Sequence, residues 1–477
     1  MISCKNCGAD LRFDAGKQKL ICDFCDSEFE VLNKINTNIK SESRLMDAIV
    51  YTCPQCGGEL YTTEDTAATF CSYCGSSVLL ERRMAAVAMP DFIIPFKVTK
   101  EQAEQAYRKK LARSLFAPSS LKDAEIEKLR GIYMPYWEYY VKDSSYVSFE
   151  ASGPTVRHGD YLCTEKFNVS FELFAESDGL EYDASSKLPD DLSSACAPYY
   201  FQESKLYNPD YMSGFYADVG DMPAKAYTPD ALDVVAEVGA EEVLSHCSFG
   251  NVLVSADEIK KHIVFNNIEP GLAMYPLWFA SVRSRDGKHI NYAAINGQSG
   301  KVAADIPVDR KKLLLWTAVF AVPFFIVLYF LFTPTPQATA IVTGIISVAA
   351  SIAGLSRINK ITGTKKKSSG QGVTVNILGK DYKFNRSKES PAPAPILPED
   401  EEALKRTKSG IKWRLVVCIV LAALLLLFNP SQDFIFYGGV VVMGVLCCWT
   451  FWSVFDIYNR LISRPLPQLD ARGGDGK

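Results

Sequence analysis

Long apolar segments interrupt the last third of this chain. Residues 313–332 and 338–355 contain no charged side chain, and residues 413–428 and 434–455 form two further apolar segments. Because about 20 apolar residues cross the hydrocarbon core of a bilayer as a helix, these four segments predict four transmembrane helices. Arg414 shortens the third apolar run, and snorkelling of its side chain to the lipid interface would extend it.

Basic residues mark one side of these segments. Lys and Arg cluster before the first and third segments and after the second and fourth, whereas the links 333–337 and 429–433 contain neither. The positive-inside rule therefore places both termini and the loop 356–412 in the cytoplasm. The expected membrane part consists of two helical hairpins, 313–355 and 413–455, with short external turns.

A mixed pattern fills residues 90–305. In residues 98–116 apolar positions recur at helical spacing after Thr99, an expected N-cap with Gln102 at the third helical position. A second short helix is expected at 121–130. Polar and apolar residues alternate from 145 to 151 and from 165 to 172, which predicts strands.

Turn signals follow near the end of this region. Residues 285–288 (RDGK) and 296–300 (NGQSG) predict two hairpin turns. The tracts 131–137 and 271–278 each contain Pro-x-Trp and run into an expected hairpin, so an internal duplication is one interpretation. We therefore expect an α+β cytoplasmic domain in residues 90–305.

The segment between the two hairpins has a different composition. Residues 356–412 combine Gly, Ser and Lys with Pro and Ala, and this mixture cannot build a core. We expect a basic, largely flexible cytoplasmic loop in which 373–384 could form a small hairpin. A cytoplasmic tail, 456–477, is expected after the last helix. The loop could also lie on anionic lipid head groups, where a well-placed Lys or Arg gains about 1 kcal/mol.

Eight of the fourteen cysteines repeat one spacing, C-x2-C-x14-C-x2-C, at residues 4–25 and again at 53–74. Two C-x-x-C pairs supply four thiolates around one ion, and such a closed shell is typical of structural zinc. The repeat predicts zinc ribbons in residues 1–30 and 51–83, each with one Zn²⁺, joined by a polar connector, 31–50, with some helical character. The expected ligands are Cys4, Cys7, Cys22 and Cys25 in the first ribbon and Cys53, Cys56, Cys71 and Cys74 in the second.

The residues after the cysteine pairs fit this interpretation. Gly8, Gly57 and Gly75 follow three pairs, and Asp26 follows the fourth; these residue types tolerate a positive φ. Disulfides, a redox C-x-x-C pair, a rubredoxin-like iron site and ligands shared between the two ribbons are alternatives. Thiolate-bound zinc suits a reducing cytoplasm, and the chain has no recognisable cleavable signal peptide.

The net charge of −4 hides an uneven distribution. Residues 1–312 hold 33 Lys and Arg against 45 Asp and Glu, a difference of −12, whereas residues 357–412 hold 13 against 6, a difference of +7. A protein that binds phosphates needs a basic face, so the acidic ribbons disfavour nucleic acid as a partner. Phe24 and Tyr73, each between two knuckle cysteines, are candidate contacts for a protein partner; packing within the ribbon is the alternative.

Catalytic motifs are not apparent. The histidines lie outside metal-ligand spacings, no G-x-S-x-G element occurs, and residues 297–301 (GQSGK) lack the spacing of a phosphate-binding loop. The apolar segments contain almost no ionisable residue, which disfavours a transport path. The four histidines are His158, His246, His262 and His289.

The second apolar segment carries a stripe of small residues at successive i+4 positions. Gly344 and Gly354 add further small surface. Such a stripe permits close approach of helices, either between the two hairpins or between subunits of a homo-oligomer. Its members are Thr339, Thr343, Ser347 and Ser351.

The ribbons occur together with the tracts IPFKV at 94–98, YMSGFYAD at 211–218 and NGQSGKV at 296–302. In this combination the chain resembles a bacterial family of TFIIB-type zinc-ribbon-containing membrane proteins, some of them labelled primosomal-helicase-like. The resemblance covers residues 1–330 and implies a scaffold. Some relatives look like partners of SPFH-domain and phage-shock-type proteins of envelope stress. The chain departs from the helicase label because it has no nucleotide-binding motif.

These patterns predict a multi-domain fold: two N-terminal Cys4 zinc ribbons, an α+β cytoplasmic domain and a four-helix transmembrane region. The expected function is a non-enzymatic adaptor or scaffold in the bacterial inner membrane, with both termini and the ribbons cytoplasmic and a surface for protein partners. The alternative is a membrane-tethered nucleic-acid-binding protein linked to transcription or replication.

Overall fold

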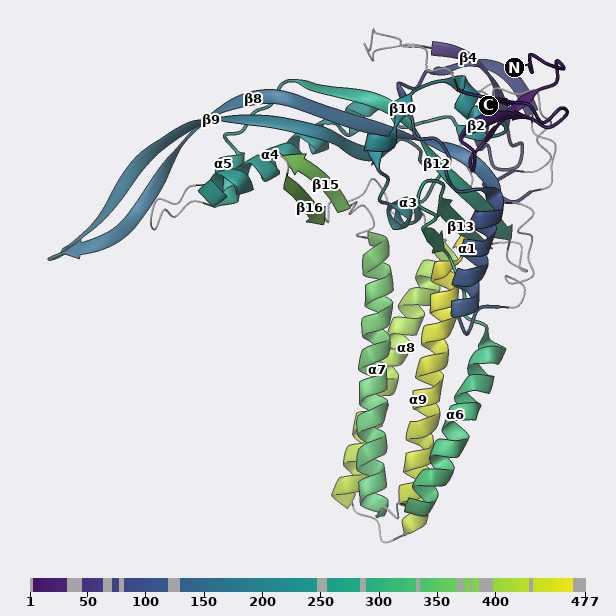
Figure 1. The fold of residues 1–477 in the computed structure, drawn as a ribbon. Coiled ribbons are helices and arrows are strands. Elements are labelled where there is room, and N and C mark those ends of the chain that lie inside the picture. The colour runs from purple at the N-terminus through teal and green to yellow at the C-terminus, as the bar shows by residue number, and fades with distance from the viewer. Residues whose placement is uncertain are drawn as a thin grey trace, which may run out of the picture.

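The computed structural model describes residues 3–31, 45–62, 71–76, 81–118, 129–246, 255–283, 289–331, 335–366, 372–377, 380–385, 398–428 and 432–465. A body of strands and short helices sits on one end of a group of long helices, and a two-stranded arm extends sideways from the body (Figure 1). We use "body" for the described part of residues 3–308 without the arm. The arm comprises residues 144–158 and 161–174.

One large sheet forms the centre of the body. Its strands follow the order β10-β7-β12-β8-β11-β5-β4-β6, with β13 beside β12 and β9 beside β8. A smaller sheet belongs to the first cysteine repeat alone and consists of β1 (Leu11–Asp14), β2 (Lys19–Cys22) and β3 (Glu28–Phe29). The strands of the large sheet are β4 (Leu45–Thr52), β5 (Glu59–Thr62), β6 (Glu81–Ala88), β7 (Phe92–Ile93), β8 (Arg130–His158), β9 (Tyr161–Asp183), β10 (Lys205–Leu206), β11 (Tyr216–Asp218), β12 (Ile268–Arg283), β13 (His289–Asn296), β14 (Val302–Ala304) and β17 (Arg464–Pro465).

The two Pro-x-Trp tracts pair with each other at the centre of this sheet. Strands β8 and β12 run antiparallel, and Gly131 lies opposite Trp278. Phe215 stacks on Phe96 with ring centroids 4.3 Å apart, beside Gly131. A Cβ at Gly131 would lie 2.4 Å from the Phe215 ring, so only glycine allows this approach. Tight aromatic packing therefore explains the glycine that opens the first tract.

Helix α1 (Lys100–Arg113) confirms the predicted helix and its start. Thr99 accepts from the backbone of Gln102, and the Gln102 side chain accepts from the backbone of Thr99, which completes a capping box. Ala103, Tyr107 and Leu111 form its buried face. The second predicted helix, 121–130, lies almost wholly outside the described residues, and β8 begins at Arg130.

The predicted hairpins are confirmed where the chain is described. Strands β12 and β13 pair antiparallel, while the turn 285–288 between them lies outside the described residues. Strands β13 and β14 also pair antiparallel, and Gly300 in their turn has a φ of +74°. The GQSGK tract is therefore a hairpin turn. Strands β12, β13 and β14 all belong to the large sheet. Helices and strands both occur in the described part of residues 90–305, as expected for an α+β domain.

The base of the arm rests on two helices. Every second residue of the arm is buried from 145 to 151, and these side chains share a core with α4 (Thr228–His246) and α5 (Ala256–Lys260). The predicted alternation is therefore confirmed over 145–151. Beyond α5, the described residues from 154 to 168 are exposed on both faces. The remaining short helices of the body are α3 (Asp190–Cys196), η2 (Phe201–Glu203), η3 (Pro209–Met212) and η4 (Ala224–Ala226).

Four long helices extend from the body: α6 (Arg310–Leu331), α7 (Pro336–Lys366), α8 (Pro398–Phe428) and α9 (Asp433–Ile462) (Figure 1). Three of them are long and apolar enough to cross a membrane within the described residues, over Pro336–Asn359, Asp400–Phe428 and Phe434–Ile462. The structure thus supports three candidate spans where the sequence predicted four. Helix α6 covers the first predicted segment, but not all of its side chains are described.

The stripe of small residues lies in a contact between the two predicted hairpins. Ser347 is buried, and its hydroxyl donates to the Met443 carbonyl of α9 over 3.3 Å. A Cβ at Gly354 would lie 2.9 Å from Val454, also on α9. Arg414 of α8 is 6% exposed; its guanidinium bonds Ser453 and covers the Trp449 ring. Arg414 therefore packs against α9, and the predicted snorkelling of its side chain to the lipid interface stays a prediction.

The loop between the hairpins is shorter than predicted. Helix α7 continues to Lys366 and α8 begins at Pro398, so helices occupy both ends of the segment 356–412. Ion pairs at i,i+4 join Glu401 to Lys405 and Glu402 to Arg406, and such pairs support a helix outside the apolar core. The predicted hairpin at 373–384 is confirmed as β15 (Gly372–Ile377) and β16 (Lys380–Asn385).

The second cysteine repeat is larger and less independent than the sequence indicated. The connector 31–50 was expected to have helical character, but β4 begins at Leu45. Strand β6 continues to Ala88, five residues beyond the predicted end of the second ribbon at residue 83. Strands β4 and β6 pair with each other from Leu45↔Ala88 to Thr52↔Glu81.

Candidate metal centres

The first four cysteines converge at one end of a small sheet. Cys4 and Cys7 precede β1 (Leu11–Asp14). Cys22 is the last residue of β2 (Lys19–Cys22), and Cys25 lies between β2 and β3 (Glu28–Phe29). The sulfur atoms of Cys4 and Cys25 are 3.5 Å apart, and those of Cys7 and Cys22 are 3.4 Å apart. All four sulfurs lie within 4.8 Å of one another.

The second four cysteines repeat this arrangement. The sulfurs of Cys53 and Cys74 are 3.9 Å apart, and those of Cys56 and Cys71 are 3.7 Å apart. Each cluster takes its cysteines from one repeat, so ligands shared between the repeats are excluded. Four sulfurs placed tetrahedrally about 2.3 Å from a zinc ion would lie about 3.8 Å apart. Both clusters fit a tetrahedral metal ion, and their separations are too long for a disulfide.

Backbone geometry positions the sulfurs. In each knuckle the residue directly after the second cysteine donates its N–H to the carbonyl of the first cysteine, four positions earlier, over 2.8–3.0 Å. These donors are the residues that the sequence singled out, and all have positive φ: Gly8, Asp26, Gly57 and Gly75. The predicted tolerance of positive φ is therefore confirmed at all four knuckles. Ser27 lowers the pKa of the Cys25 thiol to about 6 through its hydroxyl and backbone, which favours the thiolate that binds metal.

The two clusters differ in exposure. In the first, Cys7 and Cys25 are exposed, whereas all four cysteines of the second are buried, at 1–4% exposure. The aromatic residues between the knuckle cysteines differ in the same way. Phe24 is 81% exposed, so it remains a candidate contact residue. Tyr73 is 2% exposed and packs near Phe279 of β12, so Tyr73 is buried against the central sheet and not only within the ribbon.

The second cluster is joined to the central sheet through β5. Ala217 and Asp218 of β11 pair with Tyr61 and Leu60 of β5. The Tyr292 hydroxyl of β13 also donates to the Tyr73 carbonyl over 2.8 Å. These contacts connect the second repeat to strands far along the chain, while the first repeat keeps a sheet of its own.

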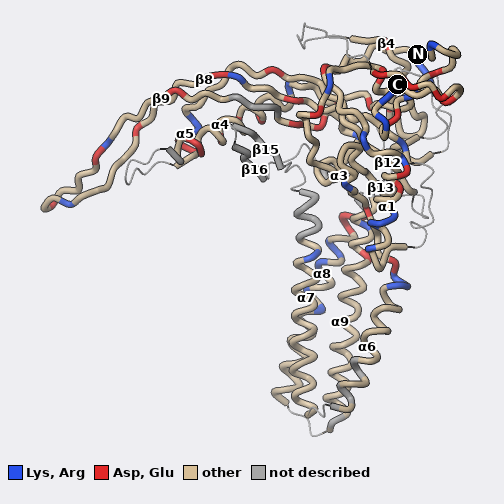
Figure 2. The backbone as a smooth tube through the Cα atoms, viewed as in Figure 1, with Lys and Arg blue, Asp and Glu red and all other residues tan. Residues whose placement is uncertain are grey.

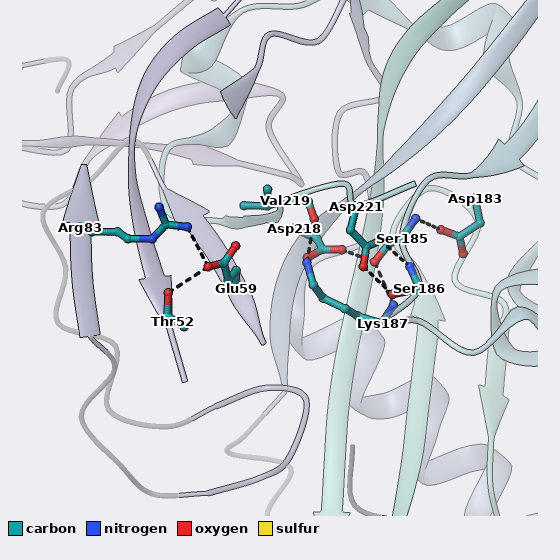
Figure 3. Close-up of polar contacts among 10 residues, drawn as sticks. All are labelled: Thr52, Glu59, Arg83, Asp183, Ser185, Ser186, Lys187, Asp218, Val219 and Asp221. Atoms are coloured by element: carbon teal, nitrogen blue, oxygen red, sulfur yellow. Dashed lines mark hydrogen bonds and ion pairs between the residues drawn. The ribbon is translucent and has the colours of Figure 1, made fainter. Parts of the chain in front are cut away.

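A buried ion pair lies beside this junction (Figure 3). Lys187 donates to the Asp218 carboxylate and to the Val219 carbonyl, each over 2.7 Å. The side chains of Lys187 and Asp218 are 6% and 0% exposed, and the Ser185 hydroxyl donates to the same carboxylate. Burial raises the pKa of Asp218, and Lys187 opposes that rise. The arrangement holds the loop after β9 against β11, and its groups are too buried to serve as an open catalytic site.

A second polar contact in Figure 3 joins three strands of the second repeat. Glu59 on β5 accepts from Arg83 of β6 over 2.8 Å and from the Thr52 hydroxyl of β4 over 3.2 Å. Glu59 is largely buried, whereas Arg83 is about half exposed. The pair therefore fastens β4, β5 and β6 together at the edge of the sheet.

Two further carboxyl groups meet inside the body. Glu138 and Glu181 lie opposite each other on β8 and β9, and the Tyr275 hydroxyl donates to Glu138. Burial raises the pKa of Glu138 well above its usual value and that of Glu181 to about 7. Sequence reasoning did not find this pair. A signal existed, because Glu138 interrupts the aromatic run YWEYY at 136–140.

Potential metal ligands outside the cysteine clusters do not gather in the described residues, where these two clusters are the groups found. His158 lies opposite Tyr161 near the end of the arm, and His262 follows α5. Neither histidine belongs to a group of potential metal ligands. The side chains of His246 and His289 lie outside the described part of the chain.

The uncharacterized protein YdjG of Bacillus subtilis (strain 168) is 31% identical to this chain over 322 residues, which cover 66% of this chain and 92% of YdjG. This chain belongs to the YdjG family. A scan of protein-family models gave no match, and no solved structure matches. The resemblance to zinc-ribbon membrane proteins stays a prediction.

Proposed function

We propose that this protein is a non-enzymatic, membrane-anchored adaptor whose first ribbon offers a contact surface to a protein partner. The observation that carries the proposal is the exposure of Phe24, at 81%, on a knuckle of a small separate sheet. A phenylalanine gains little by lying in water, and exposed aromatic residues are enriched where proteins bind. Tyr73, its counterpart in the second repeat, is buried and serves the fold.

Charge supports a protein partner rather than nucleic acid. Acidic residues surround the first knuckles, and those near Phe24 include Asp23 and Asp26. Arg12, which could contact a phosphate, is bound to Asp23 over 2.8 Å. Red and blue segments intermingle over the body without a continuous basic face in the view of Figure 2. Phosphate binding requires such a face.

Each cysteine cluster holds one Zn²⁺ in this proposal. A tetrahedral set of four sulfurs is typical of zinc and leaves no position for a substrate. The ion would stabilise each repeat, because a sheet of three short strands buries little apolar surface by itself.

Helix α6 is the fourth membrane-spanning helix in this proposal. The chain enters α6 and leaves α9 at the same place, because the Val308 backbone and the Asn459 side chain exchange two hydrogen bonds of 2.7 and 2.8 Å. A chain that returns to its starting side has crossed the bilayer an even number of times. The three spans of α7, α8 and α9 alone would give an odd number.

The body lies on the cytoplasmic side of a bacterial inner membrane in this proposal. Basic residues at the body end of the helices support that orientation, among them Arg310, Arg357 and Lys412. SPFH-domain and phage-shock-type membrane-stress proteins are the first partners to test, since the zinc-ribbon resemblance implies them. A homo-oligomer is a further possibility for the exposed apolar faces of the helices.

The test is crosslinking in native membranes followed by identification of the proteins that co-purify with the full-length chain. Wild type is compared with Phe24→Ala and with Leu115→Ala, a control on another exposed apolar residue of the body, 60% exposed. We expect a defined set of proteins that Phe24→Ala loses and Leu115→Ala retains, with unchanged metal content. Recovery of nucleic acid that salt removes, with no protein lost in Phe24→Ala, would overturn the adaptor role.

A further inference from the structure

We propose that the free end of the β8–β9 arm contacts the lipid surface of the membrane that the helices cross. This inference rests on the membrane anchoring proposed above, but not on the adaptor role. The contact residues at the end of the arm are Val156, Tyr161 and Leu162.

The first argument is the continuity of one face of the arm. At its base, Phe171 lies opposite Val147, and this face packs on α4 and α5. Side chains alternate along a strand, so every second residue of β9 from Phe171 to Tyr161 belongs to the same face. The register shift between Ser152 and Thr155 places the extra residue on β8, so β9 keeps its alternation. The packed face therefore continues to the free end.

The second argument is what this face carries beyond α5. Phe167 is 47% exposed, Val156 51% and Tyr161 77%, and nothing in the described part of the chain covers them. Leu162, on the opposite face, is 74% exposed. Two-stranded hairpins are marginally stable in water, so an arm with apolar residues on both faces gains from an apolar surrounding. Charge is nearly balanced at the end, with Arg157 and Asp160 beside the turn.

The third argument is position. Figure 1 shows that the arm bends toward the side on which the long helices lie, and that its end reaches the level of the last turns of α7. Those turns follow the apolar span, which ends at Asn359, whereas α7 ends at Lys366. The end of the arm thus lies at the level where lipid head groups would surround α7, far to one side of the helices (Figure 1). Tyrosine is enriched at that depth, where its ring is apolar and its hydroxyl meets water.

Weak affinity is sufficient for such a contact. The helices already hold the arm beside the bilayer, so its local concentration at the lipid surface is high. Since Arg157 and Asp160 offset each other, the contact should depend little on anionic lipid. The arm would then act as a lateral support that fixes how the body is oriented over the membrane.

The experiment uses the full-length protein in lipid nanodiscs of phosphatidylcholine, with and without phosphatidylglycerol. A photoreactive benzoylphenylalanine replaces Tyr161, and irradiated products are identified by mass spectrometry. The matched control carries the same residue at Tyr146, which is 73% exposed but lies on the opposite face near the base. A positive control carries it at Trp449 of α9, which is 59% exposed.

We expect lipid adducts at 161 and 449, in both lipid mixtures, and several-fold fewer at 146. Adducts at 449 without adducts at 161, or adducts at 161 that join two protein chains, would overturn the arm contact while leaving the anchoring intact. Absence of lipid adducts at 449 would overturn the anchoring and the arm contact together. Hydrogen exchange gives a second measurement, in which Tyr161→Ser/Leu162→Ser exchanges faster than wild type over 155–164 and Tyr146→Ser/Phe174→Ser does not; equal exchange in all three contradicts the contact.

Discussion

Glu138 and Glu181 face each other across adjacent antiparallel strands in the interior of the body. Glu138 is fully buried, and the Tyr275 hydroxyl donates to it. Two neighbouring carboxyl groups that are buried away from water cannot both ionise without a large cost in free energy. The folded chain therefore keeps a proton that the unfolded chain releases. The pair therefore makes the stability of the body depend on pH.

The first prediction concerns this pH dependence. Burial raises the pKa of Glu181 from 4.5 to about 7, so the folded state binds more protons than the unfolded state between those values. The free energy of unfolding is then highest in acid and falls as pH rises through about 7, by about 1–3 kcal/mol. Glu181→Gln should make this fall smaller, because only the buried Glu138 then keeps a proton that the unfolded chain releases. Thermal unfolding of the detergent-solubilised protein at about pH 5 and about pH 8 measures the difference.

Glu172→Gln is the control for this prediction. Glu172 lies on the same strand, but it is exposed and opposite Tyr146. This variant should keep the pH dependence of wild type. If Glu181→Gln keeps it as well, the buried pair is not its cause.

The second prediction concerns the exchange of the two metal ions. Cys7 and Cys25 are exposed in the first cluster, while every cysteine of the second is buried. Wild type should contain two zinc ions per chain and lose them to a chelator in two phases, the faster from the first cluster. Cys7→Ser should abolish the fast phase and Cys56→Ser the slow phase, as metal analysis of the chelated protein would show.

The same two variants separate the structural roles of the clusters. The second cluster belongs to the core around Tyr73 and Tyr292, so Cys56→Ser should lower the free energy of unfolding of the body by at least about 3 kcal/mol. Cys7→Ser changes the equivalent, exposed cysteine of the sheet β1-β2-β3, which contacts the body mainly through residues such as Phe13, and should lower the stability of the body less. Equal melting temperatures in the two variants would contradict the difference in structural role.

The third prediction concerns the ion pair of Lys187 with Asp218. Lys187→Met leaves a buried carboxylate without its cation, which should cost about 3–5 kcal/mol of stability. Lys187→Met/Asp218→Leu removes both charges and should cost less than the sum of the single changes. Denaturant unfolding of the three variants measures this coupling. Lys97→Met is the control, since Lys97 and Glu203 form an exposed pair whose loss should cost at most about 1 kcal/mol.

The fourth prediction concerns the contact of α7 with α9. A Cβ at Gly354 would lie 2.9 Å from Val454, so Gly354→Ala should push the helices apart and cost about 1–2 kcal/mol. Gly444 of α9 has no heavy atom within 4 Å of its added Cβ, so Gly444→Ala should be neutral or slightly stabilising. Thermal unfolding in detergent compares the two. A loss of stability in both would mean that the close approach at Gly354 is not the reason.

Local features of the fold could be predicted from the sequence because their causes are local. The cysteine spacing, the positive φ after each knuckle and the capping box at Thr99 each depend on residues a few positions apart. The join between the second repeat and the central sheet could not be predicted. It depends on contacts such as the Thr62 hydroxyl with the Phe215 carbonyl, 153 residues apart. The pairing of Glu138 with Glu181 likewise depends on the register of two long strands.

The short strand β17 means that the large sheet is completed only at the end of translation. Arg464 and Pro465 pair with β13, and the Ser463 hydroxyl donates to Asn291, 172 residues earlier. A ribosome therefore completes every strand of the body except this one before it makes α9. The edge of β13 stays open until the last helix has entered the bilayer and brought β17 back. A chain that stalls during insertion would expose that edge, which cellular proteases and chaperones could use to distinguish it from a finished one.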